Sequence, residues 1–209
     1  MSTMRTHRWA TAGFTLIEMM VVIIIIALLL AWALPAYKNL TTQYRMSAEL
    51  NELDADVALA RSSAIREGIN VTICPSANPT VTTPSCTGAN AWGTGWIIFT
   101  DTALPSGNQT YQPDNGDVLL HVHNTLQNGD TVASTIAGTT AVNALTFNRL
   151  GGTASFGTNA EQSLTGQLTL NDSNSDPSMI RCLVISEAGT ITVNSPQNTA
   201  QGNGPSNCI

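Results

Sequence analysis

The sequence predicts an α+β protein in which one long N-terminal helix packs on an antiparallel, β-rich globular head. Three observations carry this prediction. An apolar run lies near the N-terminus, a helical repeat of apolar residues follows it, and the repeat becomes alternating after Gly68. The chain has 209 residues, so about 140 remain after the helix, enough for one compact domain with its own core.

A short leader with two arginines, residues 1–13, precedes the apolar run 19–36, and Glu18 stands at the edge of that run. A carboxylate in a membrane segment costs about 2.5–3.5 kcal/mol at a helix centre and less near an end. The segment itself contains no cationic side chain before Lys38. Cleavage of the leader would supply a cation, because it creates a new α-amino group.

The stretch 13–18, GFTLIE before an apolar run, resembles the N-terminus of type IV prepilins. The type IV pilin superfamily includes pilins and the pseudopilins of type II secretion. The resemblance implies that a prepilin peptidase cuts after Gly13 and N-methylates Phe14. It also implies that Glu18 pairs with the N-terminus of a neighbouring subunit during assembly. Pro35 stands where that family often has a helix-kinking proline.

Two simpler interpretations of the apolar run remain. One is an ordinary secretory signal cleaved at the A-x-A stretch 31–33, although its core would exceed the usual 7–15 apolar residues. The other is a plain membrane anchor, because the run approaches the ~20 residues that span a bilayer. Neither explains Glu18 or the GFTLIE pattern.

The helix is expected to continue beyond the membrane, over residues 14–67. Pro35 should bend or locally melt it, and Gly68 is a natural C-terminal stop. The predicted organisation is a leader 1–13, an apolar helical half 14–36, an amphipathic half 37–67 and a head 68–209. The expected buried stripe of the second half, which excludes Glu49, Glu52, Asp56 and Arg66, consists of Met46, Leu50, Leu53, Val57, Ala60 and Ala64.

The head is expected to be built from short strands separated by turn-rich loops. Loops are predicted at 74–86, 105–116 and 194–206 from their composition. The predicted strands are 69–73, 95–100, 118–123, 144–147, 152–156, 163–170, 179–186 and 190–193.

All four cysteines, Cys74, Cys86, Cys182 and Cys208, lie after the apolar run. An even number in an exported domain favours two disulfides, for which three pairings are possible. We favour Cys74–Cys86 and Cys182–Cys208, because each closes a local, turn-rich segment. A zinc site built from cysteine is disfavoured, because the sequence has neither C-x-x-C spacing nor a nearby histidine.

Head stretches resemble the GspH/FimT-type minor pilins and pseudopilins. They are 92–101 (WGTGWIIFTD), 114–120 (DNGDVLL), 147–151 (FNRLG) and 182–186 (CLVIS), followed by Gly189. The resemblance implies a FimU-like, tip-associated minor type IV pilin that helps to start pilus assembly. Its expected partners are other minor pilins, the major pilin and prepilin peptidase. Its expected location is the inner membrane with a periplasmic head, and later the pilus on the cell surface.

Two alternatives stay open. One is a GspH-like minor pseudopilin of a type II secretion system. The other is a DNA receptor, which is disfavoured, because the G-R-x-R motif of DNA-uptake relatives is replaced here by Gly189-Thr190-Ile191-Thr192. Net charge is −6, and removal of two leader arginines makes it −8, so bulk charge does not attract nucleic acid.

No catalytic constellation appears in the sequence, which lacks a nucleophile elbow, a phosphate loop and an H-E-x-x-H motif. We therefore expect no enzyme, cofactor or metal. His121 and His123 share a strand face, which is half of a metal site. Asp101, Asp114 and Asp117 could lend oxygen ligands, but no spacing identifies them. We expect the histidines to occupy a solvated strand face beside a turn.

Overall fold

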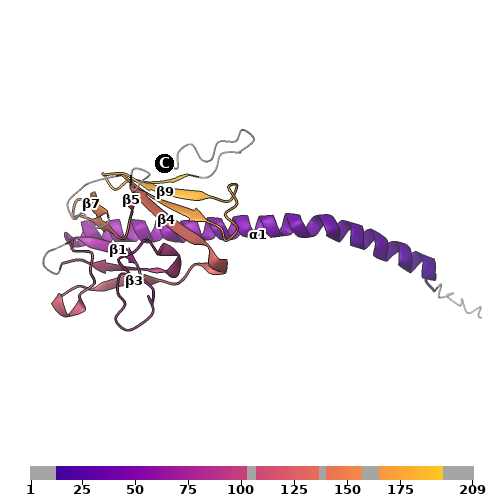
Figure 1. Cartoon of the computed structure of the whole chain (residues 1–209), viewed down its shortest axis with the longest axis horizontal. Helices are drawn as coiled ribbons and strands as arrows, with labels where there is room; N and C mark the ends of the chain where they lie inside the picture. Colours follow the sequence, from indigo (N-terminus) through magenta and orange to yellow (C-terminus); the bar gives the residue numbers. More distant parts are fainter. Residues whose placement is uncertain (1–12, 103–106, 137–139, 157–164, 195–209) are drawn as a thin grey trace, which may run out of the picture. The chain divides into compact units, whose positions relative to one another are not determined.

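The computed structural model describes residues 13–102, 107–136, 140–156 and 165–194. The chain divides into two compact units, residues 1–41 and 42–209, and helix α1 (Leu16–Glu67) has residues in both. Figure 1 shows α1 as the single long helix and the strands gathered around its second part. The predicted α+β architecture, with one long helix and an antiparallel head, is confirmed.

The ends of α1 follow from local chemistry. The hydroxyl of Thr15 accepts a hydrogen bond from the amide of Glu18 (3.3 Å), as at the N-terminus of a capping box. Gly68 adopts a left-handed conformation (φ +70°), and its amide donates to the carbonyl of Ala64 at 2.9 Å. Residues on both sides of Pro35 remain helical, so the local melting that we considered there does not occur.

In the described residues, the head forms two antiparallel sheets of five strands each. Neighbours in the first sheet follow the order β3-β2-β1-β6-β7, and in the second β10-β9-β8-β4-β5. The first sheet consists of β1 (Val71–Pro75), β2 (Trp96–Thr100), β3 (Leu119–His123), β6 (Leu145–Phe147) and β7 (Thr153–Phe156). The second consists of β4 (Thr131–Ile136), β5 (Thr140–Ala141), β8 (Gly166–Asn171), β9 (Arg181–Ile185) and β10 (Ile191–Asn194).

One apolar core joins the second part of α1 to both sheets. The predicted stripe is buried, with exposed fractions from 0% to 4% at all six positions. It packs with side chains of the first sheet, such as Ile73 and Phe147, and of the second, such as Leu168 and Leu183. Burial of apolar surface contributes about 25 cal/mol per Å², so this core is the main source of stability in the head.

A smaller core covers the other face of the first sheet. Ile97 and Phe99 pack there with Cys74, and Tyr111 lies against the Phe99 ring at 5.3 Å between centroids. Cys74 is disulfide-bonded to Cys86, which confirms that predicted pairing. The predicted pairing of Cys182 involves Cys208, which lies outside the described residues.

The structure corrects several expectations about the head. Strands β4 and β5 were not predicted from the sequence. Three short 3-10 helices occupy segments expected to be irregular or not assigned: η1 (Trp92–Thr94), η2 (Pro113–Asn115) and η3 (Gln127–Gly129). Glu49 and Asp56, expected to lie off the buried stripe, are only 5% and 7% exposed. They are buried because loops and β3 of the head cover that side of the helix as well.

Candidate functional site

The first part of α1 is an apolar helix without a core. An 18-residue window of this helix has a mean hydropathy of 2.8, and none of the window is buried. By length and composition it can cross a membrane. Large apolar side chains such as Ile23, Leu29 and Trp32 are 61%, 66% and 84% exposed. This segment therefore needs an apolar environment from outside the chain.

The residues predicted to act in processing and assembly stand at the start of this segment. Gly13 and Phe14 precede the helix, and among the described residues none lies within 4 Å of the place where a side chain at Gly13 would begin. Glu18 lies in the first turn, where a negative charge complements the helix dipole. Its side chain is exposed, and so is Pro35 further along. The roles of these residues stay predictions.

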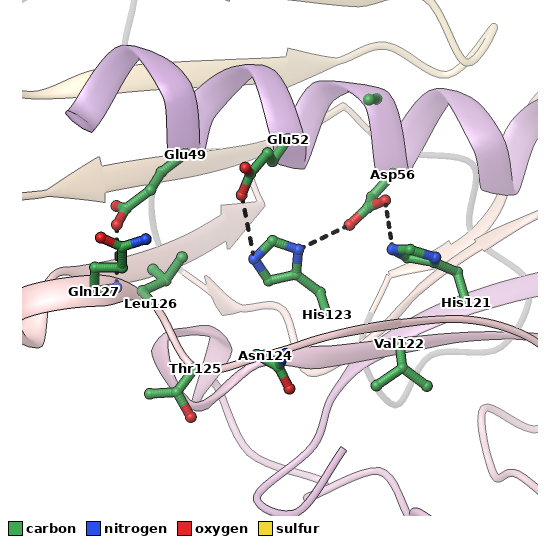
Figure 2. Close-up of a pocket in the computed structure, with 11 residues that line it drawn as sticks. Glu49, Glu52, Asp56, His121, Val122, His123, Asn124, Thr125, Leu126 and Gln127 are labelled. Carbon is green, nitrogen blue, oxygen red and sulfur yellow. Dashed lines mark hydrogen bonds and ion pairs between the residues drawn. The ribbon is translucent and has the colours of Figure 1, made fainter. Parts of the chain in front are cut away.

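The head carries a polar groove of about 440 Å³ between the second part of α1 and strand β3. Figure 2 shows three acids of α1, Glu49, Glu52 and Asp56, facing the β3 end and the segment that follows it. Helical spacing explains this alignment, because residues three and four apart share a face. His121 and His123 point toward the helix from alternate positions of β3.

Asp56 is the centre of this groove. Its Oδ1 lies 3.2 Å from His121 Nε2, and its Oδ2 lies 3.3 Å from His123 Nδ1. The indole Nε1 of Trp96 donates to the same Oδ2 at 2.8 Å. Trp96 also stacks on the His123 ring, with centroids 3.8 Å apart and planes 5° apart. His123 Nε2 faces Glu52 Oε2 at 3.8 Å. The buried Asp56 carboxylate thus faces ring nitrogens of three side chains, Trp96, His121 and His123.

The expected solvated strand face describes His121, whose side chain is 42% exposed, but not His123, whose side chain is 15% exposed. The histidines meet a helix carboxylate, while the loop acids considered from the sequence are used elsewhere. Asp101 accepts hydrogen bonds from Thr72 Oγ1 (2.7 Å) and from backbone amides, and Asp117 accepts from the amides of Thr102 and Gln112. Asp114 is exposed in its turn. These acids order the loop instead of facing the histidines.

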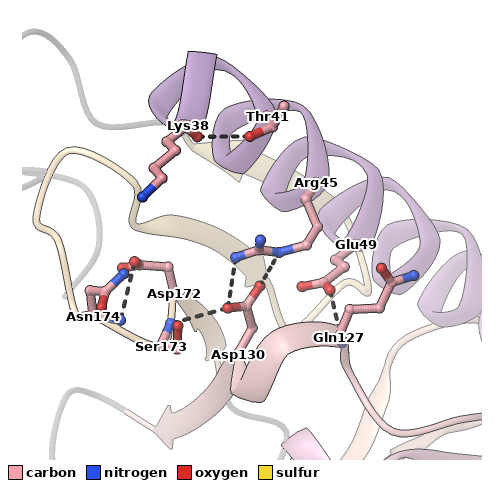
Figure 3. Close-up of polar contacts among 9 residues, drawn as sticks. All are labelled: Lys38, Thr41, Arg45, Glu49, Gln127, Asp130, Asp172, Ser173 and Asn174. Carbon is pink, nitrogen blue, oxygen red and sulfur yellow. Dashed lines mark hydrogen bonds and ion pairs between the residues drawn. The ribbon is translucent and has the colours of Figure 1, made fainter. Parts of the chain in front are cut away.

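A second polar cluster lies around Arg45, which precedes the groove acids on α1 (Figure 3). Arg45 donates two hydrogen bonds to Asp130, from Nε to Oδ2 at 2.8 Å and from Nη2 to Oδ1 at 3.0 Å. The amide of Ser173 also donates to Asp130. This bidentate pair ties α1 to the turns before β4 and after β8.

Glu49 lies beside this pair and accepts a hydrogen bond from the amide of Gln127 at 3.1 Å. Burial raises the pKa of Glu49 to about 7; the Gln127 bond opposes this rise, and the nearby negative charge of Asp130 adds to it. Sequence reasoning missed both Glu49 and Asp56 as interior acids. The sequence showed that the two acids share one helix face. It did not show which part of the head would cover that face.

Comparison with known proteins identifies the family. Residues 49–189 match the family described as Type II transport protein GspH, and residues 10–34 match the prokaryotic N-terminal methylation motif. The chain belongs to the GspH family. The match runs from the second part of α1 to the turn after β9, so it covers the groove and all the strands described above except β10 in this GspH-family head. It is a family of minor pilins and pseudopilins, which are structural subunits.

Two curated relatives, each a fimbrial protein of Pseudomonas aeruginosa, are 34% identical over 132 residues, which cover 62% of this chain and 75% of the relative. The crystal structure of the type IV minor pilin FimU of P. aeruginosa matches this GspH-family chain with a TM-score of 0.52 and 20% identity, over 78% of this chain and 95% of FimU. The minor pseudopilin EpsH of Vibrio cholerae matches with a TM-score of 0.49 and 12% identity, over 75% and 97%.

Proposed function

We propose that this chain is a FimU-like minor type IV pilin, a tip-associated structural subunit that helps to start pilus assembly. The proposal rests on the combination of three features in one chain. They are an N-terminal methylation motif, an exposed apolar helix and a GspH-type head. The 34% identity to fimbrial proteins favours a pilus over a secretion system.

The proposed sequence of events follows from the chemistry of the N-terminus. Prepilin peptidase cuts after Gly13 and methylates the amine of Phe14, while α1 anchors the subunit in the inner membrane with its head in the periplasm. Glu18 then pairs with the N-terminal amine of a neighbouring subunit. This pairing offsets the cost of a carboxylate in an apolar environment. The exposed apolar side chains of residues 14–36 pass from lipid to neighbouring helices.

A deletion of the gene, complemented with the full chain, tests this function. We expect the deletion to reduce the number of surface pili counted by electron microscopy, and complementation to restore them. Release of extracellular enzymes should remain normal. Loss of secretion with intact pili would contradict the proposal and move the minor pseudopilin to first place.

DNA reception remains disfavoured. Thr190 and Thr192, at the positions of the two motif arginines, lie at the β9–β10 hairpin, where the Thr190 amide donates to Ser186 Oγ at 3.2 Å. Neither side chain neutralises a phosphate. Full-length mature protein in detergent should not shift duplex DNA at micromolar concentration. A tight, steeply salt-dependent complex would contradict this expectation.

A further inference from the structure

We propose that Asp56, His121 and His123 form a binding site for Zn²⁺ in the head. Neither family match assigns a metal to these positions, and the proposal is independent of whether the subunit serves a pilus or a secretion system. The site would join α1 to β3, which is the terminal strand of its sheet.

The spacing of the donor atoms is the first support. One ligand atom from each of the three side chains lies within 4.8 Å of the others. The two carboxylate-to-imidazole distances are 3.2 Å and 3.3 Å. Two donors that each lie about 2.1 Å from a tetrahedral zinc ion are about 3.4 Å apart. The first distance ends on Oδ1 of Asp56 and the second on Oδ2, so an ion shared by all three side chains requires this carboxylate to turn or to bind through both oxygens.

The chemical type of the donors is the second support. Two imidazole nitrogens and one carboxylate oxygen suit Zn²⁺, whereas Ca²⁺ and Mg²⁺ prefer oxygen ligands alone. Zinc sites with three protein ligands leave the fourth position to water. The groove of about 440 Å³ beside the three side chains has room for that water.

The surroundings are the third support, because they orient the ligands as metal sites require. Trp96 holds one Asp56 oxygen by its N–H and stacks on the His123 ring. When His123 binds the ion through Nδ1, its Nε2–H faces the Glu52 carboxylate, 3.8 Å away. Metal-ligating histidines usually direct their second ring nitrogen toward such an acceptor. Figure 2 shows Glu52 and Asp56 on opposite sides of that ring.

The competing explanation is a metal-free network in which ring N–H groups of both histidines donate to Asp56. It accounts for the same distances, so metal binding itself must be measured. The two explanations also differ in what they expect of Glu52. In the metal-free network Glu52 matters little for the bond between Asp56 and His121, whereas in the zinc site it supports His123 as a ligand.

The test uses full-length mature protein in detergent with a tag that contains no histidine. The chain has three histidines, and His7 leaves with the leader. The mature chain therefore retains only His121 and His123. After removal of metal with EDTA, we expect calorimetry to show one Zn²⁺ per chain. Co²⁺ should give the visible absorption of a tetrahedral site, and neither Ca²⁺ nor Mg²⁺ should compete.

The variants distinguish the two explanations. His121→Ala should weaken Zn²⁺ binding at least 100-fold, and Glu52→Gln about 10-fold, the range for loss of an outer partner. The His121 side chain is 42% exposed, so its loss should leave the fold intact, which circular dichroism checks. Asp114→Asn, a loop acid away from the groove, is the matched control and should bind normally. Stoichiometric Zn²⁺ binding that survives both His121→Ala and His123→Ala, or no binding by the unaltered chain, would overturn the proposal.

Discussion

The two parts of α1 have the same backbone and opposite surroundings. In residues 16–41 the apolar side chains are exposed around the helix, and no core forms on them. In residues 42–67 an apolar stripe is buried, and both sheets pack against it. The first part therefore depends on lipid or other subunits, whereas the second is stabilised within its own chain. One helix can therefore expose an apolar surface in one part and bury an apolar stripe in another through its side-chain pattern alone.

The largest expected effect concerns assembly through the first part of the helix. Glu18→Ala should still be processed and inserted into the membrane, because the cleavage site and apolar run are unchanged. It should be lost from pili, because no carboxylate then meets the amine of a neighbour. Immunoblots of membranes and of sheared pili measure this. Glu67→Ala, a surface acid at the other end of α1, is the control, and normal incorporation of Glu18→Ala would refute the pairing role.

The same substitution in the two parts should affect the head very differently. Leu53 is 1% exposed and Leu29 is 66% exposed. Leu53→Ala should lower the free energy of unfolding of the head by about 2–5 kcal/mol, because it leaves a cavity. Leu29→Ala should leave it unchanged. Urea unfolding in detergent, followed by fluorescence of the buried Trp92 and Trp96, measures both. Equal losses would show that the two parts fold as one unit.

The Cys74–Cys86 disulfide lies in the head, which is stabilised within its own chain. Replacement of Cys74 and Cys86 together by alanine should cost about 2–4 kcal/mol, because the unfolded chain is then less constrained. Incorporation into pili should survive if enough head remains folded at growth temperature. Urea midpoints of the double variant and the unaltered protein give the difference. An unchanged midpoint would mean that the bridge adds no stability.

The smallest expected effect is a pH dependence from Glu49. Its folded pKa of about 7 lies above the ordinary 4.5, so between these values the folded state binds more protons than the unfolded state. This contribution is complete below pH 4.5 and is lost as pH rises through 7. Glu49→Gln should therefore remove about 2–3 kcal/mol of the fall in unfolding free energy between pH 5 and pH 8. Glu67→Gln should not, and an equal slope in both variants would contradict the assignment.

Much of the fold could be predicted from local pattern. The buried stripe has a clear helical period, the strand around Trp96 is a short continuous apolar run, and Gly68 marks the end of the helix. Strand β4 could not be predicted in this way, because its sequence TVASTI places a serine, Ser134, in the interior. The Ser134 hydroxyl donates there to the Val142 carbonyl. The groove was only half predictable. The alternation of His121 and His123 was visible, but their meeting with Asp56 depends on tertiary packing of a distant helix face.

We propose that the apolar helical half, residues 14–36, acts in assembly after cleavage at Gly13. Mass spectrometry of this subunit recovered from sheared pili tests it most directly. We expect a mature chain that begins with N-methyl-Phe14 and retains Glu18. A subunit absent from pili, or one whose N-terminus lies near residues 32–35 as for an ordinary secretory signal, would contradict it.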